Sequence, residues 1–111
     1  TLNSSRAKLE DITNALHPTP AVCGTPRDVA MNFIERHEDY DRTYYTGFLG
    51  PVFEAQQSSK LFVNLRSLSI KGNEATLYAG GGITIDSAPE GEWEETHNKL
   101  QTMAKVIEPL L

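Results

Sequence analysis

Three consecutive glycines constrain the fold of this chain more than any other feature, since residues 79–83 read AGGGI. Glycine weakens a strand interior, so a run of three predicts a strand end or a place where another group approaches the backbone closely. Residues 87–90 read SAPE, which has the spacing of a helix capping box with proline just inside the helix. The sequence therefore predicts a strand end, a loop and a helix start in close succession.

The helix that starts here carries charged groups on one side. On a wheel of about 100° per residue, Glu92, Glu95 and Lys99 share a face beside the apolar stripe. Together with bare backbone N–H groups, two carboxylates and an ammonium can hold an anionic ligand and a hard cation such as Mg²⁺. A solvated helix end, with Glu95 and Lys99 paired at i, i+4, explains the charges equally simply. A β-bulge or a crowded helix crossing would likewise explain the glycines.

The remaining pattern predicts two helices and three strands. Residues 4–17 and a segment from Pro26 to the acidic run at 35–41 have helical apolar spacing, with Thr25 as N-cap of the second. Because consecutive strands joined by short turns pair antiparallel, the predicted fold is α+β: a three-stranded antiparallel meander with helices packed on one face. Its exposed edges could let the chain self-associate. The predicted strands and last helix are 43–54, 61–70, 74–83 and 87–107, with turns at 55–59 and 71–73.

Composition excludes several classes of partner. The chain of 111 residues is 39% hydrophobic and 23% charged, as a single globular domain is. The net charge is −5 and no basic run alternates with aromatic residues, so no nucleic-acid partner is expected. No apolar stretch is long enough for a membrane span, and a lone Cys23 suits a reducing cytoplasm. The chain starts at Thr1 rather than Met, and we expect residues 1–111 to be a single piece of a larger protein.

Several segments together resemble the chorismate-utilising enzymes, and among them the isochorismate synthase branch. The HPTP sequence at 17–20 is similar to that branch, whereas the anthranilate and aminodeoxychorismate synthases usually differ there. The resemblance implies the C-terminal portion of a chorismate-binding catalytic domain, and it covers almost the whole chain. The segments are LHPTPAVCG at 16–24, DR at 41–42 with Tyr45, Gly47 and Gly50, NLR at 64–66, YAGGGI at 78–83, and GEWEET at 91–96 with Lys99.

The resemblance implies a Mg²⁺-dependent interconversion of chorismate and isochorismate, in menaquinone or siderophore biosynthesis. It implies that Glu95 ligates Mg²⁺, that Glu92 lies in or beside the metal shell, and that the metal holds the ring carboxylate. Lys99 would supply positive charge near the substrate and metal carboxylates.

The resemblance also implies how the other end of the substrate is bound. Arg66 and the backbone N–H groups near Gly81 and Gly82 would bind the enolpyruvyl carboxylate, and Tyr45 would line the pocket. From the sequence pattern alone, Arg66 lies in the middle of a strand, where it could equally face solvent. Tyr45, as an aromatic strand residue, could equally belong to the core.

Departures from the family pattern limit what this chain can do alone. The family's general-base lysine, general-acid glutamate and other Mg²⁺-binding glutamate lie upstream of the residues present, so no catalytic residue is assigned here. We expect this chain to be inactive by itself and its parent to be a monomeric enzyme. Thr43 stands where glycine is common, and Ile85 and Ala88 replace commoner small and acidic residues. A salicylate or anthranilate synthase, or a non-catalytic binding module, are the alternatives.

Overall fold

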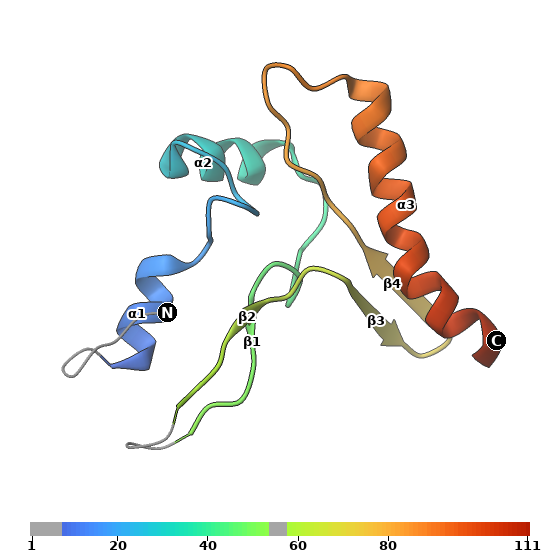
Figure 1. The fold of residues 1–111 in the computed structure, drawn as a ribbon, viewed down its shortest axis with the longest axis horizontal. Helices are drawn as coiled ribbons and strands as arrows, with labels where there is room; N and C mark the ends of the chain where they lie inside the picture. The colour runs from blue at the N-terminus through green and yellow to red at the C-terminus, as the bar shows by residue number, and fades with distance from the viewer. Residues whose placement is uncertain (1–7, 54–57) are drawn as a thin grey trace.

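The structure, a computed structural model, describes residues 8–53 and 58–111 and confirms the α+β class (Figure 1). Two parts of the predictions lie outside the described residues. They are positions 4–7 of the first predicted helix, and positions 54–57, where the first predicted strand ends and the following turn begins. The elements are α1 (Leu9–Leu16), α2 (Arg27–His37), β1 (Phe48–Leu49), β2 (Phe62–Val63), β3 (Ser67–Lys71), β4 (Glu74–Tyr78), α3 (Pro89–Ile107) and the 3₁₀ turn η1 (Glu108–Leu110).

The predicted three-stranded meander is wrong. The described strands form two separate two-stranded antiparallel sheets, β1 with β2 and β3 with β4. The strand predicted at 61–70 is interrupted at residues 64–66, where the Asn64 carbonyl oxygen accepts a hydrogen bond from the Thr46 N–H at 2.8 Å. Because the chain bends there, its two halves pair with different partners, and Arg66 lies at the bend rather than in mid-strand.

Two other predicted strands are shorter than expected. Residues 43–47 form a tight turn, with positive φ at Thr43 and Thr46, so only Phe48 and Leu49 of the first predicted strand pair. β4 ends at Tyr78, so the three glycines lie in the loop after the strand. The two-residue turn between β3 and β4 was predicted correctly, and Gly72 adopts a φ of 61° that favours glycine.

The helix boundaries follow the sequence with local differences. α3 begins at Pro89 and ends at Ile107 as predicted, but the capping box is not formed, because Ala88 is the N-cap and the Ser87 hydroxyl accepts the Thr84 N–H at 2.9 Å. Pro26, rather than Thr25, is the N-cap of α2. That helix runs on to His37 instead of fraying earlier, since basic residues in its last turn suit the negative end of the helix dipole.

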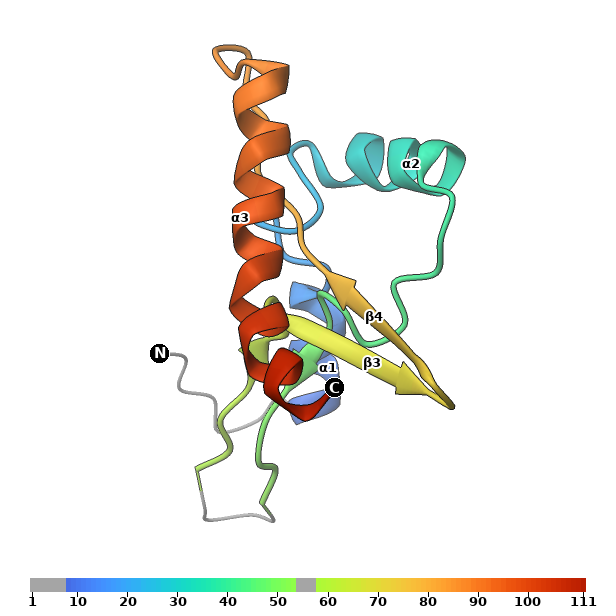
Figure 2. The same cartoon turned by 90° about the vertical axis from the view of Figure 1, so that its right-hand side faces the viewer.

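The chain is open, with little interior of its own. α3 runs beside β4 and the loop that follows it, while α1 and α2 stand away from α3 (Figures 1 and 2). Among the described residues only Tyr45 and Thr46 are buried, at 8% and 6% exposure. The accessible surface is 9394 Å², against about 6,100 Å² for a compact monomer of this mass. The radius of gyration is 16.6 Å, where about 13 Å is usual.

Large apolar side chains therefore lie on the surface, including Ile83, Ile85 and Trp93. Apolar surface of this extent marks a face that another part of a protein covers. Within the described residues, no helix combines the length and the hydropathy that crossing a membrane would take.

Candidate functional site

Lys99 joins α3 to the loop after β4 that contains Gly80, Gly81 and Gly82, which we call the glycine loop. Its Nζ lies 2.5 Å from Glu95 Oε1, which is the i, i+4 pair expected from the sequence, and it donates a hydrogen bond to the Gly80 carbonyl oxygen at 3.2 Å. The Lys99 side chain is half-buried while Glu95 is exposed. The lysine thus fixes the loop against one face of the helix and leaves the carboxylate accessible.

The glycine loop lies directly against the charged face of α3. A Cβ atom at Gly81 would lie 3.4 Å from Glu92 Oε2 and 4.0 Å from Lys99 Nζ. These are ordinary van der Waals distances to the ends of two flexible side chains, so the backbone at Gly81 lies beside both charged groups. At Gly82 no described atom lies within 4 Å of such a Cβ, so this end of the loop is open.

Tyr45 forms the wall behind the loop. Its ring is buried and stacks on Tyr78 with the centroids 5.3 Å apart. Its hydroxyl lies 2.7 Å from the point that a Cβ atom at Gly80 would occupy. Gly80 is therefore explained by the approach of an aromatic side chain, a possibility that the sequence pattern did not reveal because Tyr45 is distant along the chain.

Two titratable groups of the site have shifted pKa values, for different reasons. The hydrogen bond from Lys99, followed by the lysine charge and a smaller effect of Arg66, lowers the pKa of Glu95. Burial raises the pKa of the Tyr45 phenol, against the opposing charges of Arg42, Arg66 and Lys99. Arg66 is exposed at the bend between β2 and β3, and its charge acts on the pKa values of both Tyr45 and Glu95.

A pocket of about 270 Å³ opens beside this cluster. It shares Gly81 and Glu92 with the charged face and adds Trp93, which the sequence pattern places only in the apolar stripe of the helix. The pocket therefore combines an apolar surface with a carboxylate and an open backbone. Its lining residues are Gly81, Ile83, Ser87, Pro89, Glu92, Trp93 and Thr96.

Glu92 and Glu95 are the carboxylates of this face that could contribute ligands to a metal ion. Glu92 and Glu95 lie one turn apart on α3, and Mg²⁺ is usually held by one or two carboxylates together with waters and substrate oxygens. Across residues 8–53 and 58–111, no three or more His, Cys, Asp or Glu side chains gather as a metal site. The two glutamates would thus supply only some of the ligands.

The structure brings together four of the seven residues assigned to the site from the sequence: Gly81, Glu92, Glu95 and Lys99. Tyr45 lies behind the neighbouring Gly80, and Gly82 lies at the open end of the loop. Arg66, exposed at the bend between β2 and β3, acts on the cluster only through its charge.

This arrangement of a pocket, a neighbouring lysine and two glutamates one helical turn apart accompanies a clear family relationship. The family described as chorismate binding enzyme matches residues 2–108, and the chain belongs to that family.

Individual relatives are isochorismate synthases. The chain is 42% identical over 107 residues to isochorismate synthase MenF of Escherichia coli strain K12, which covers 95% of this chain and 24% of the relative. It is 39% identical over 97 residues to isochorismate synthase DhbC of Bacillus subtilis, covering 87% of this chain and 24% of the relative. The chain thus spans about a quarter of the length of these relatives. No solved structure matches it.

Proposed function

We propose that this chain forms one wall of the active site of a Mg²⁺-dependent isochorismate synthase, which interconverts chorismate and isochorismate. The observation that carries the proposal is the position of Lys99, bonded to Glu95 and to the Gly80 carbonyl oxygen, in a chain of the chorismate binding family. The relatives named as isochorismate synthases support the particular reaction.

The two carboxylates of the substrate match the charged and N–H groups that this chain would contribute to the active site. Chorismate carries two carboxylates, and each needs cationic or N–H partners. In our proposal, Arg66 and the backbone N–H groups of Gly81 and Gly82 bind the enolpyruvyl carboxylate. Tyr45, which does not line the pocket beside Trp93, would close the substrate site from behind Gly80. Arginine suits this role because its planar guanidinium can bind a carboxylate through two hydrogen bonds.

The ring carboxylate would be bound at the other end of the wall. Glu92 and Glu95 would hold Mg²⁺, which when bound supplies a hard Lewis-acidic centre for a substrate carboxylate. Lys99 neutralises part of the negative charge that two glutamates and a dianion bring together. Its contact with Oε1 of Glu95 also orients that carboxylate.

The reaction exchanges the position of a hydroxyl group. Water attacks one ring carbon and hydroxide leaves another, so the product is an isomer of the substrate and one water is consumed and one released. Such proton transfers need a positioned acid and base. We propose that these groups come from other parts of a catalytic domain, of which this chain corresponds to one wall, and that the chain alone has no activity. The enzyme would work in the cytoplasm, in menaquinone or siderophore biosynthesis.

A chimaera tests the proposal directly. The segment of Escherichia coli MenF that matches this chain would be replaced by it, and chorismate turnover and products would be followed by liquid chromatography. We expect isochorismate formation that requires added Mg²⁺ and stops with a chelator, with no turnover by the 111-residue chain alone.

Two outcomes would count against the proposal. A chimaera that melts as cooperatively as the parent relative but does not consume chorismate would show that this wall cannot complete the site. Formation of salicylate and pyruvate would show that it directs a different reaction.

A further inference from the structure

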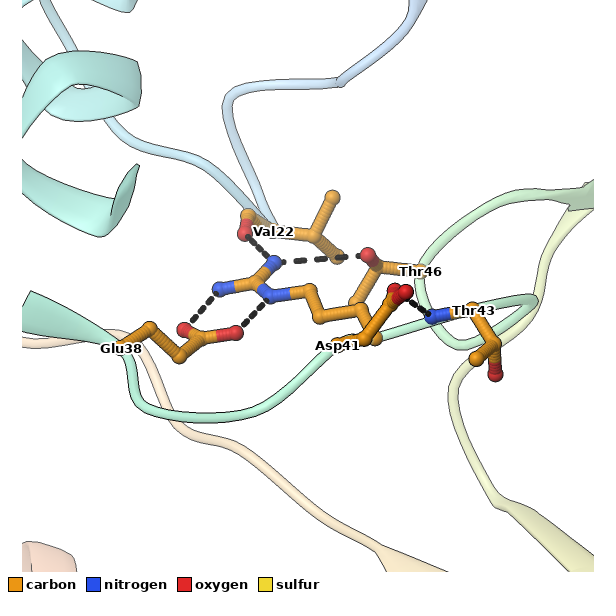
Figure 3. A network of polar contacts seen from close by, with 6 residues as sticks. Val22, Glu38, Asp41, Thr43 and Thr46 are labelled. Atoms are coloured by element: carbon orange, nitrogen blue, oxygen red, sulfur yellow. Dashed lines mark hydrogen bonds and ion pairs between the residues drawn. The ribbon is translucent and has the colours of Figure 1, made fainter. Parts of the chain in front are cut away.

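One arginine, Arg42, joins three separate segments of the chain (Figure 3). Nε and Nη2 of Arg42 donate hydrogen bonds to the two carboxylate oxygens of Glu38, at 2.5 and 2.8 Å. Nη1 donates to the Val22 carbonyl oxygen at 2.9 Å and to the Thr46 hydroxyl at 3.3 Å. The guanidinium therefore links the loop after α1, the end of α2 and the turn at 42–47.

This contact is stronger than an ordinary surface ion pair. The side chains of Arg42 and Glu38 are only 24% and 20% exposed, and the pair is bidentate. Charge-assisted, bidentate hydrogen bonds that are partly shielded from water hold their partners in a defined orientation. Lysine could not reproduce this, because an ammonium has no fork geometry.

The turn that Arg42 holds is strained. Thr43 and Thr46 have φ values of 52° and 68°, and both are β-branched residues in the left-handed region. The Asp41 carboxylate accepts the Thr43 N–H at 2.8 Å, and the Asn64 carbonyl oxygen accepts the Thr46 N–H at 2.8 Å. Such conformations persist only where the surroundings hold them.

The strained turn carries Tyr45. The Tyr45 N–H donates to the Arg42 carbonyl oxygen at 2.9 Å, the ring stacks on Tyr78, and the hydroxyl lies beside Gly80. Since Thr43, two residues before Tyr45, and Thr46, directly after it, are in a disfavoured conformation, release of the guanidinium contacts would let the turn relax and the ring move.

We propose that Arg42 is a positioning residue for the chorismate site: through the strained turn it holds the Tyr45 ring behind the glycine loop and so sets the affinity for substrate. This inference rests on the proposed function. Because Tyr45 acts as a wall and not in proton transfer, loss of Arg42 weakens binding of substrate and transition state alike, which raises KM and leaves kcat nearly unchanged.

The test compares two arginine substitutions in the chimaera. We expect Arg42→Ala to raise KM for chorismate about tenfold, which corresponds to about 1.4 kcal/mol of binding free energy. The kcat should stay within about twofold of its starting value, because the interaction is shared by ground and transition states. Arg36→Ala, which removes an exposed arginine in the last turn of α2, is the matched control and should leave both constants unchanged.

A double-substitution cycle separates positioning from simple stabilisation. If Arg42 acts through Tyr45, then Arg42→Ala should have little further effect on KM once Tyr45→Ala has removed the ring. A KM rise of the same factor in both backgrounds, or an unchanged KM in Arg42→Ala, would overturn the inference. Should Arg42→Ala not fold, Glu38→Gln removes the charge of the partner while keeping its shape. An unchanged KM in that variant at an unchanged melting temperature would also overturn it.

Hydrogen exchange makes failure of this inference distinguishable from failure of the proposed function. The amides of Tyr45 and Thr46 are both hydrogen-bonded, so the peptide that covers them should be protected and should lose protection in Arg42→Ala. Loss of protection in a chimaera without activity would leave the role of Arg42 in the turn intact and refute the enzyme function. Unchanged protection in an active chimaera would refute the role of Arg42.

Discussion

The hydroxyl of Tyr45 lies 2.7 Å from the position that a Cβ atom on Gly80 would take. The two residues are far apart in the sequence, yet the Tyr45 hydroxyl leaves no room for a side chain at residue 80. The Tyr45 ring is held by its burial and by stacking on Tyr78, so it cannot move aside at no cost. Lys99 holds the Gly80 carbonyl from the other side. Gly80 is thus fixed between an aromatic ring and a helix.

We therefore expect Gly80→Ala to destabilise the chimaera by about 1–2 kcal/mol, since an added methyl in a filled position forces neighbouring groups to shift. Urea unfolding followed by fluorescence would measure the change. Gly82→Ala is the control and should be tolerated, because its added Cβ meets open space. Adding Tyr45→Phe to Gly80→Ala should restore part of the loss; no recovery would mean that the clash lies elsewhere.

The turn before Tyr45 offers a stabilising substitution. Thr43 has a φ of 52°, where a side chain costs about 1 kcal/mol or more relative to glycine. Thr43→Gly should raise the free energy of unfolding, with a net gain of about 0.5 kcal/mol after the greater entropy of unfolded glycine. A higher urea midpoint would confirm this.

The neighbouring Thr46 is the informative contrast. It also has a positive φ, but its side chain is buried and its hydroxyl accepts a hydrogen bond from Arg42. Thr46→Gly loses that contact and should be neutral or destabilising. Equal gains from both substitutions would argue that backbone strain alone decides stability at this turn.

The buried phenol of Tyr45 predicts a loss of stability at alkaline pH. Burial raises its pKa in the folded state above the ordinary value of about 10. The folded chain then keeps a proton that the unfolded chain releases, so the free energy of unfolding falls as pH rises above the ordinary tyrosine pKa. Urea unfolding between neutral pH and pH ~11 should show a shallower fall for Tyr45→Phe than for the unsubstituted chimaera. Parallel curves would contradict the assignment.

Glu95 should matter for metal-dependent turnover and little for folding. The carboxylate is exposed, so its removal leaves no buried group unpaired, while our proposal gives it a Mg²⁺-binding role. We expect Glu95→Ala to abolish Mg²⁺-dependent formation of isochorismate with an unchanged melting temperature. Glu94→Ala removes an exposed acid from the same helix and should leave activity intact. Normal activity in Glu95→Ala would mean that the metal is held by other groups.

Arg66 should affect substrate affinity. As the proposed carboxylate partner at the bend between β2 and β3, its loss in Arg66→Ala should raise KM for chorismate about tenfold or more, the effect of losing a charged hydrogen bond. Steady-state kinetics of the chimaera would measure it, with the melting temperature as the control for folding. A change confined to the melting temperature would make Arg66 a structural residue only.

Much of the fold follows from local sequence. The proline and apolar spacing place α3 at residues 89–107, Gly72 marks the turn between β3 and β4, and Glu95 and Lys99 pair across one helical turn. Each of these depends on residues within a few positions of one another, which is the range over which capping, turn geometry and helical spacing act.

Other features depend on contacts between distant segments and could not be predicted in this way. The bend at residues 64–66, which separates the two sheets, is tied to the turn at 43–47 by the hydrogen bond between Thr46 and Asn64. The contact of Arg42 with Val22 joins residues 20 positions apart. The hydroxyl of Tyr45 likewise lies beside Gly80, which is distant from it in the sequence.

The sequence alone therefore determined the helices, the turn at Gly72, the resemblance to the family and the charged residues that gather around the glycine loop. The tertiary structure decided where those residues lie relative to one another. Only the structure showed that the contacts of Arg42 and a strained turn hold Tyr45. The physical reason is that propensity and periodicity act between near neighbours, whereas strand partners and the packing of a ring against a glycine arise only when remote segments meet.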